Sequence, residues 1–269
     1  MTSLCDRDTA VRALVESADP GAVWAVGGAE GPQAGSEAGH PADASFDVGG
    51  LADVLALWPA LGALVDEGAL RLHTPLAAYG EAAAADTPAG TTAHHLLTHP
   101  GGTPALTRLA EHLCGSPLAD LAATRVWHPL GMTGTRFTDG TLRAPLTDLV
   151  RFLRHLLAPA DPKGAADPTG AAGPTGAAGP TGAAGAEGIS RAWTAESLRI
   201  RTGELTPARG LLWHPAPHGV WTHHAPHDGG PALWVSPRHH RWAILLPADG
   251  QGPLRTAFRE AAFAPTHAA

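Results

Sequence analysis

The chain has 269 residues, of which 44% are hydrophobic, and this is enough to bury the core of one large domain. Its 25 acidic and 18 basic residues give a formal charge of -7, which argues against a nucleic-acid partner and against a basic membrane-surface helix. We therefore expect a small-molecule or protein partner. The charged N-terminal stretch lacks a secretory signal pattern, and no apolar run approaches the roughly 20 residues of a membrane span, so we expect a cytoplasmic protein.

Several reactive residue types are scarce. The two cysteines, Cys5 and Cys114, fit neither a disulfide framework nor a metal knuckle, and we expect both to be reduced and structural. The single lysine, Lys163, lies in a low-complexity stretch, and the single tyrosine is Tyr79. Few side chains are therefore available as an ammonium or phenol in catalysis.

The N-terminal part of the chain predicts helices around one strand. Val11–Ala18 has the spacing of an amphipathic helix, and the small and apolar residues from Gly21 to Gly28 predict a β-strand. The Gly-, Ala- and Pro-rich stretch Ala29–Ala44 predicts a loop. Leu51–Gly68 has apolar residues at helical spacing, although Pro59 is expected to kink or interrupt this helix.

The middle of the chain predicts further helices and one insertion. Thr91–His99, Pro104–Leu113 and Leu146–Leu157 each have helical spacing. A PTGAAG repeat then places Gly at every third position from Gly170 to Gly185, within an insertion predicted at 159–188. Its few triplets do not make a collagen helix, so we expect a disordered surface segment inside a single domain, 1–269.

The C-terminal part predicts a strand meander followed by a helix. Short apolar runs separated by turn residues occur at Gly210–Trp213, Val220–His224, Ala232–Val235 and Arg241–Leu246. A helix is predicted at Pro253–Phe263. Strands at both ends thus enclose a helical middle, which is an α+β arrangement rather than alternating βαβ units.

Several of these segments resemble motifs of the serine β-lactamase and penicillin-binding-protein superfamily, in its class C and esterase-like branch. FDVGGLADV is similar to F-x-x-G-S-x-x-K, HHLLTHPGGTP to RHLLTHTSGLP, and VWHPLGMTGTRF to IFxPLGMxxTxF. Two further stretches, LVDEGALRLHTPLAAY and HHAPHDGGPALWVSPRHHRWAILLPAD, are also similar to family patterns. The resemblance implies an antiparallel sheet flanked by helices, here with a shortened helical subdomain.

The resemblance also implies where the family's chemistry would lie. Gly50 stands at the position of the serine nucleophile and Asp53 at that of the lysine, while the segment with the second-motif tyrosine is missing. At the third motif, His224 aligns with the histidine of H-x-G, and Pro226 replaces its glycine. The resemblance therefore predicts a degenerate active site that does not carry out serine acyl transfer.

Other residues remain as candidates for chemistry or binding. A ligand site is expected at Gly50, Asp53, His223, His224 and Pro226. A repurposed acid–base site on a small metabolite would use the residues Asp53, His224, His227 and Asp228. The H-H-x-x-H spacing in an extended segment lacks helical ligand geometry, so no metal and no cofactor are expected.

Three functions are consistent with these residues. The first is a pseudoenzyme that binds a small molecule or a protein without acyl transfer. The second is the acid–base enzyme just described, and the third is a scaffold or partner subunit that presents the surface left by the missing segment. A fold without its reactive residues does not decide between them.

Overall fold

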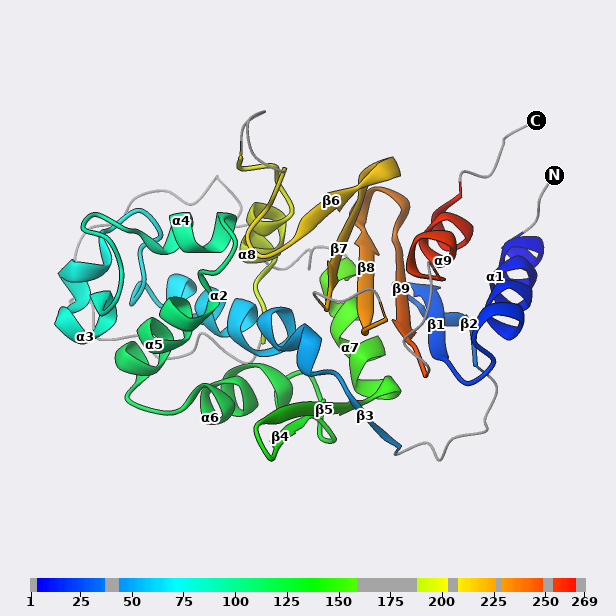
Figure 1. Cartoon of the computed structure of the whole chain (residues 1–269), viewed down its shortest axis with the longest axis horizontal. Coiled ribbons are helices and arrows are strands. Elements are labelled where there is room, and N and C mark those ends of the chain that lie inside the picture. The colour runs from blue at the N-terminus through cyan, green and yellow to red at the C-terminus, as the bar shows by residue number, and fades with distance from the viewer. Residues whose placement is uncertain are drawn as a thin grey trace, which may run out of the picture.

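The computed structural model describes residues 4–36, 44–158, 188–202, 208–225, 229–248 and 254–264. Across these residues the chain forms a six-stranded antiparallel sheet in the order β2-β1-β9-β8-β7-β6 (Figure 1). Its strands are β1 (Val23–Gly28), β2 (Gly31–Gly35), β6 (His214–Ala216), β7 (Val220–His224), β8 (Ala232–Ser236) and β9 (Arg241–Leu246). N-terminal β1 pairs with C-terminal β9, so both ends of the chain build one sheet.

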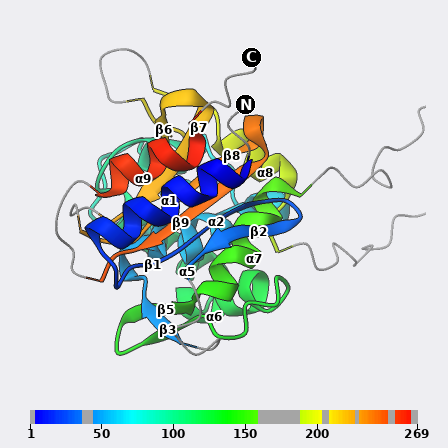
Figure 2. The same cartoon turned by 90° about the vertical axis from the view of Figure 1, so that its right-hand side faces the viewer.

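Helices cover both faces of this sheet. α1 (Leu4–Ala18) and α9 (Leu254–Phe263) lie side by side across one face, as Figure 2 shows, and α7 (Leu146–Leu157) packs on the other. The rings of Trp24 and Phe258 meet edge to face in the outer core, at a centroid distance of 6.1 Å. The sheet therefore separates two hydrophobic cores, as expected when each face of a sheet buries apolar side chains.

A helical subdomain lies beside the sheet. It contains the helices α2 (Trp58–Asp66), α3 (Glu81–Ala84), α4 (Ala93–Thr98), α5 (Thr103–Cys114), α6 (Leu118–Ala122) and α8 (Arg191–Ser197), with the shorter turns η1 (Gly49–Leu51), η2 (Asp53–Leu57) and η4 (Ala123–Trp127). A second, three-stranded sheet has the order β3-β5-β4, formed by β3 (Ser45–Asp47), β4 (Arg136–Thr138) and β5 (Thr141–Pro145). The predicted antiparallel sheet flanked by helices is confirmed.

The helix predicted at Leu51–Gly68 is present, but Pro59 does not break it. A π-helical turn, η2, runs directly into α2, and Pro59 lies in the first turn of α2. Pro59 has no N–H to donate to the Leu55 carbonyl one turn earlier, but that carbonyl accepts a hydrogen bond from the Trp127 indole at 2.7 Å instead, and the proline φ angle suits a helix. The chain therefore stays helical from Gly49 to Asp66.

Two local predictions are wrong. Ala29–Ala44 was predicted as a loop, but Gly31–Gly35 pairs with β1 as β2, since backbone hydrogen bonds form a strand there despite the glycine and proline content. Gly210–Trp213 was predicted as a strand, but the strand begins only at His214. Gly210 accounts for this: a side chain there would meet the Ser197 carbonyl at 2.1 Å, so this stretch packs against α8 instead of extending the sheet.

The remaining predicted elements follow the amphipathic patterns. α7, β7 and β9 span the predicted residues, and α9, at Leu254–Phe263, covers the described part of the predicted helix Pro253–Phe263. The predicted insertion 159–188 lies outside the described residues except for Gly188, which packs against Leu130. Within the described residues, no helix combines the length and the apolar character that crossing a membrane requires.

Candidate functional site

The end of strand β7 presses against the start of the helical subdomain at Gly50. The Asp47 carboxylate accepts a hydrogen bond from the Gly49 N–H at 2.9 Å and so shapes the turn η1. A Cβ atom on Gly50 would lie 2.5 Å from the Cβ and 3.0 Å from the Cα of Ala225. Such distances are shorter than van der Waals contact allows. Only a residue without a side chain fits here.

Ala225 is itself held firmly in place. It is fully buried, and its N–H donates to the Pro231 carbonyl at 3.0 Å. Its carbonyl accepts hydrogen bonds from the Arg255 guanidinium at 3.0 Å and from His224 Nδ1 at 2.8 Å. A larger residue at position 50 would therefore have to displace a bonded strand end rather than a flexible side chain.

Asp53 lies one helical turn after Gly50 and faces helix α5. Its Oδ2 accepts a hydrogen bond from the Thr103 hydroxyl, at 2.9 Å, at the first residue of α5. Burial raises the pKa of Asp53 above its ordinary value, while the hydrogen bond from Thr103 acts in the opposite direction. Asp53 thus links η2 to α5.

Three histidine rings gather on the neighbouring strands β6 and β7. The ring of His214 stacks on that of His224 at a centroid distance of 6.0 Å and lies 6.2 Å from that of His223. Nδ1 of His223 donates a hydrogen bond to the Leu212 carbonyl at 2.8 Å. This bond leaves the lone pair of the neutral ring on Nε2.

Burial is the main cause of the low basicity of two of these rings. Burial lowers the pKa of His223 to about 4, against the raising effect of the Leu212 carbonyl. Burial, with the nearby Arg209 and the two other imidazoles, also lowers the pKa of His214 to about 4. Both rings are therefore neutral and weakly basic at neutral pH.

The structure brings only some of the predicted site residues together. Gly50 meets the chain directly after His224, but no hydrogen bond or ion pair within the described ranges joins Asp53 to His223 or His224. Pro226, His227 and Asp228 lie outside the described residues.

Sequence reasoning missed three residues of this region: Thr103, His214 and Ala225. Thr103 and Ala225 act through contacts with residues far along the chain, which no local pattern shows. His214 belongs to a strand that was predicted too early, so its pairing with β7 was not expected. The one available signal was the pair His223–His224 on β7. A neighbouring antiparallel strand brings its own side chains close to such a pair, as β6 does with His214.

A polar hollow of about 330 Å³ lies between α4 and the chain after α8. Its lining is formed by Thr92, His94, His95, Thr98, His99, Arg201 and Thr202. Burial, followed by the charges of His73 and Arg201, lowers the pKa of His94. Arg201 already forms an ion pair with Glu196. Among the residues described, neither these histidines nor any other group of three or more His, Cys, Asp or Glu side chains is arranged so that it could hold a metal ion.

Comparison with known proteins places this geometry in a known fold. The chain is similar to a β-lactamase structure from Mycobacterium bovis, with a TM-score of 0.65, 19% identity, and coverage of 94% of this chain and 98% of that one. A class C β-lactamase from Rhodobacter sphaeroides has a TM-score of 0.66 and 14% identity, over 94% of this chain and 98% of that one. EstCE1, a hydrolase with promiscuous acyltransferase activity, has a TM-score of 0.69 and 12% identity, over 97% of this chain and 100% of that one.

The chain has the β-lactamase/transpeptidase-like fold. No family model matches the sequence, and a search of curated proteins finds no match. At these low identities the β-lactamase-like neighbours establish the fold alone. The chemistry of this chain must be inferred from its own residues.

Proposed function

We propose that this chain is a pseudoenzyme of the β-lactamase-like fold, which binds a small molecule or a protein partner without serine acyl transfer. The contact between Gly50 and Ala225 carries this proposal. The motif resemblance assigns Gly50 to the position of the nucleophile, and a glycine offers no hydroxyl. The buried strand end at Ala225 also leaves no space for the Cβ of a serine.

The proton-transfer partner is also absent in this proposal. Asp53 takes the position of the family's lysine, but its carboxyl accepts a hydrogen bond from Thr103 and cannot act as an ammonium. The single tyrosine cannot supply the phenol, because the Tyr79 hydroxyl is bonded to the backbone of Arg71. The acid–base alternative pairs Asp53 with His224, His227 or Asp228. Within the described residues, Asp53 accepts a hydrogen bond from Thr103 and no bond joins it to His224, which gives that alternative no support.

The first test is the intact mass of the protein after incubation with β-lactams and activated esters. We expect an unmodified mass, and we expect the same for the double variant Gly50→Ser/Asp53→Lys, because Ala225 occupies the space that the serine needs. An acyl adduct on the wild-type protein, at Cys114 or at any serine, would overturn the proposal.

The steric basis can be tested separately by a double-mutant cycle. Gly50→Ala should destabilise the protein by about 1–3 kcal/mol, the usual cost of overpacking a core. In an Ala225→Gly background the same change should cost clearly less, because the closest atom has been removed. Equal costs in both backgrounds, measured by urea unfolding, would show that the contact does not restrict position 50.

A further inference from the structure

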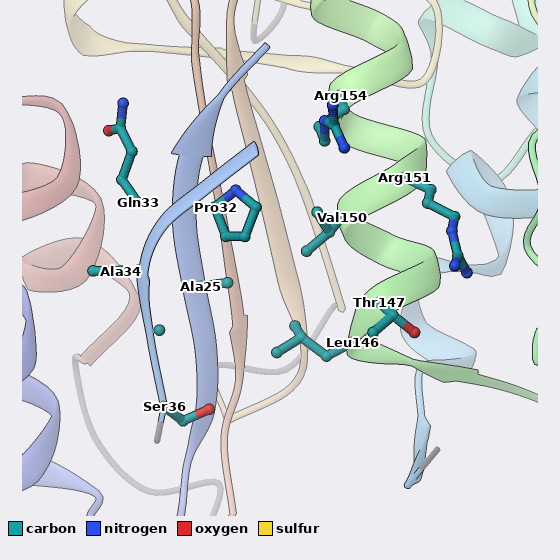
Figure 3. A pocket seen from close by; sticks show the side chains of 11 residues that line it. Ala25, Pro32, Gln33, Ala34, Ser36, Leu146, Thr147, Val150, Arg151 and Arg154 are labelled. Carbon is teal, nitrogen blue, oxygen red and sulfur yellow. The ribbon is translucent and has the colours of Figure 1, made fainter. Parts of the chain in front are cut away.

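A groove of about 470 Å³ lies between the edge strand β2 and helix α7 (Figure 3). It shares no lining residue with the region around Gly50. The lining residues that matter here are Ala25 and Pro32 on the strands and Leu146, Val150, Arg151 and Arg154 on α7. The volume falls within the range of pockets that hold small organic ligands.

The middle of the groove is lined by apolar side chains. Leu146, Val150 and Arg154 are spaced four residues apart, so they form one row along α7. Figure 3 shows Leu146 and Val150 pointing towards β1 and β2, with the Pro32 ring opposite. Leu146 and Val150 remain half-buried and Pro32 is exposed, so an apolar ligand would remove more of their surface from water.

The row ends in a cation. Nε of Arg154 donates a hydrogen bond to the Ala29 carbonyl at 3.0 Å, which holds the guanidinium at one end of the groove. Within the described residues, its two terminal nitrogens have no further hydrogen bond or ion pair. Arg151 differs, because it pairs with Asp148 at 2.7 Å and points away from the groove in Figure 3. A guanidinium fork presents paired donors that match a carboxylate.

The edge strand itself argues against a peptide as the occupant. β2 is only five residues long, with glycine at both ends, and Pro32 has no N–H to offer to an added strand. Proline and short length are features that protect sheet edges from pairing with further strands. An elongated small molecule does not need those backbone hydrogen bonds.

We propose that this groove binds a monocarboxylate with an unbranched apolar tail, such as a medium-chain fatty acid. The carboxylate binds the free terminal N–H groups of Arg154. The tail lies along Val150 and Leu146, against Pro32 and Ala25. This site is independent of the proposed loss of acyl transfer.

The proposal is tested by titrating the full chain with sodium octanoate, with 1-octanol and acetate as comparison probes, by calorimetry. We expect octanoate to bind more tightly than octanol, and acetate not to bind. Arg154→Met should weaken octanoate binding about tenfold and leave octanol binding unchanged. Arg191→Met, which removes an exposed arginine on α8, should leave octanoate binding unchanged.

A second variant covers the case in which Arg154→Met does not fold. Val150→Gln places a polar group in the middle of the apolar wall and should weaken both octanoate and octanol. The proposal is overturned if octanoate does not bind the wild-type chain or if both groove variants bind it normally. The proposal is also overturned if an extended peptide competes with octanoate for the groove. It is likewise overturned if the chain sediments with anionic vesicles but does not bind free octanoate. An acyl adduct in the mass experiment would leave this site unaffected.

Discussion

His223 is buried, with 7% of its surface exposed, and its ring can take up a proton, so it makes the stability of the fold depend on pH. Its pKa in the folded chain is about 4, below the ordinary value of about 6.5, so protons bind more tightly to the unfolded chain. The stability that the neutral ring supplies is therefore complete above about pH 6.5 and is lost as pH falls towards 4. We expect His223 to account for a loss of about 2 kcal/mol in unfolding free energy between pH 7.5 and pH 5.

The measurement is urea unfolding of the wild-type chain and of His223→Gln at both pH values. Glutamine retains a donor for the Leu212 carbonyl but has no proton to gain, so its loss on acidification should be smaller by that amount. His128→Gln, a change at an exposed histidine, should keep the full wild-type loss. Identical losses in all three proteins would show that His223 is not the titrating group.

At this same scale, the sequence identified Gly50, Asp53 and His223 but not the residues that give them their properties. Ala225 restricts Gly50, and Thr103 binds Asp53, each across a long stretch of chain. Neither partner carries a local signal, since alanine and threonine are ordinary core and helix-start residues. The chemistry of a site depends on such contacts, and they require a three-dimensional structure.

At the level of elements, helix α2 is joined to α8 through two tryptophans. The Trp193 indole donates to the Trp58 carbonyl at 3.0 Å, and the Trp58 indole donates to Ser197 at 2.8 Å. The Trp193 ring lies directly over Gly62, where a Cβ would approach it to 2.4 Å. The absence of a side chain at Gly62 is what allows the two helices to pack this closely.

We expect Gly62→Ala to destabilise the protein by about 1–3 kcal/mol, although alanine gains roughly 1 kcal/mol in helix propensity over glycine. Ala63→Gly, at the neighbouring and partly buried position, gives the cost of the alanine-to-glycine exchange in this helix away from the Trp193 ring. In a Trp193→Leu background the Gly62→Ala penalty should shrink, because the clashing ring is gone. A stabilising Gly62→Ala, measured by thermal unfolding, would contradict this packing.

Elements were predictable where the hydrophobic pattern was strong. α7 has an apolar face and a charged face along its whole length. β7 and β9 are apolar runs bounded by turn residues. β2 was missed because its glycines and proline lack strand propensity, and its pairing with β1 comes from backbone bonds. The small strands β3, β4 and β5 were missed because three to five residues give too short a pattern.

For the whole molecule, the main feature is an open sheet in which strands from the two ends of the chain pair with each other, with a hydrophobic core on each face. Pairing of β1 with β9 and packing of α1 on α9 bring N- and C-terminal segments together. The motif resemblance predicted an antiparallel sheet flanked by helices, whereas local patterns alone gave only an α+β class. Cooperative unfolding of both cores is expected, because β1 contributes residues to each of them.

The residues directly before and after the segment 159–187 are held close to each other. Nε2 of His155, in the last turn of α7, is bonded to the Ile189 carbonyl at 2.7 Å, and Gly188 packs against Leu130. Replacing 159–187 with an eight-residue Gly-Ser linker should therefore preserve the fold. The shorter loop should stabilise the protein by about 1 kcal/mol, since the entropy cost of closing a loop grows with its length.

Calorimetry should show a melting temperature a few degrees higher for the shortened protein. His155→Ala should reduce stability in both the full-length and the shortened protein. A melting temperature lowered by ten degrees or more would mean that this segment packs against the domain.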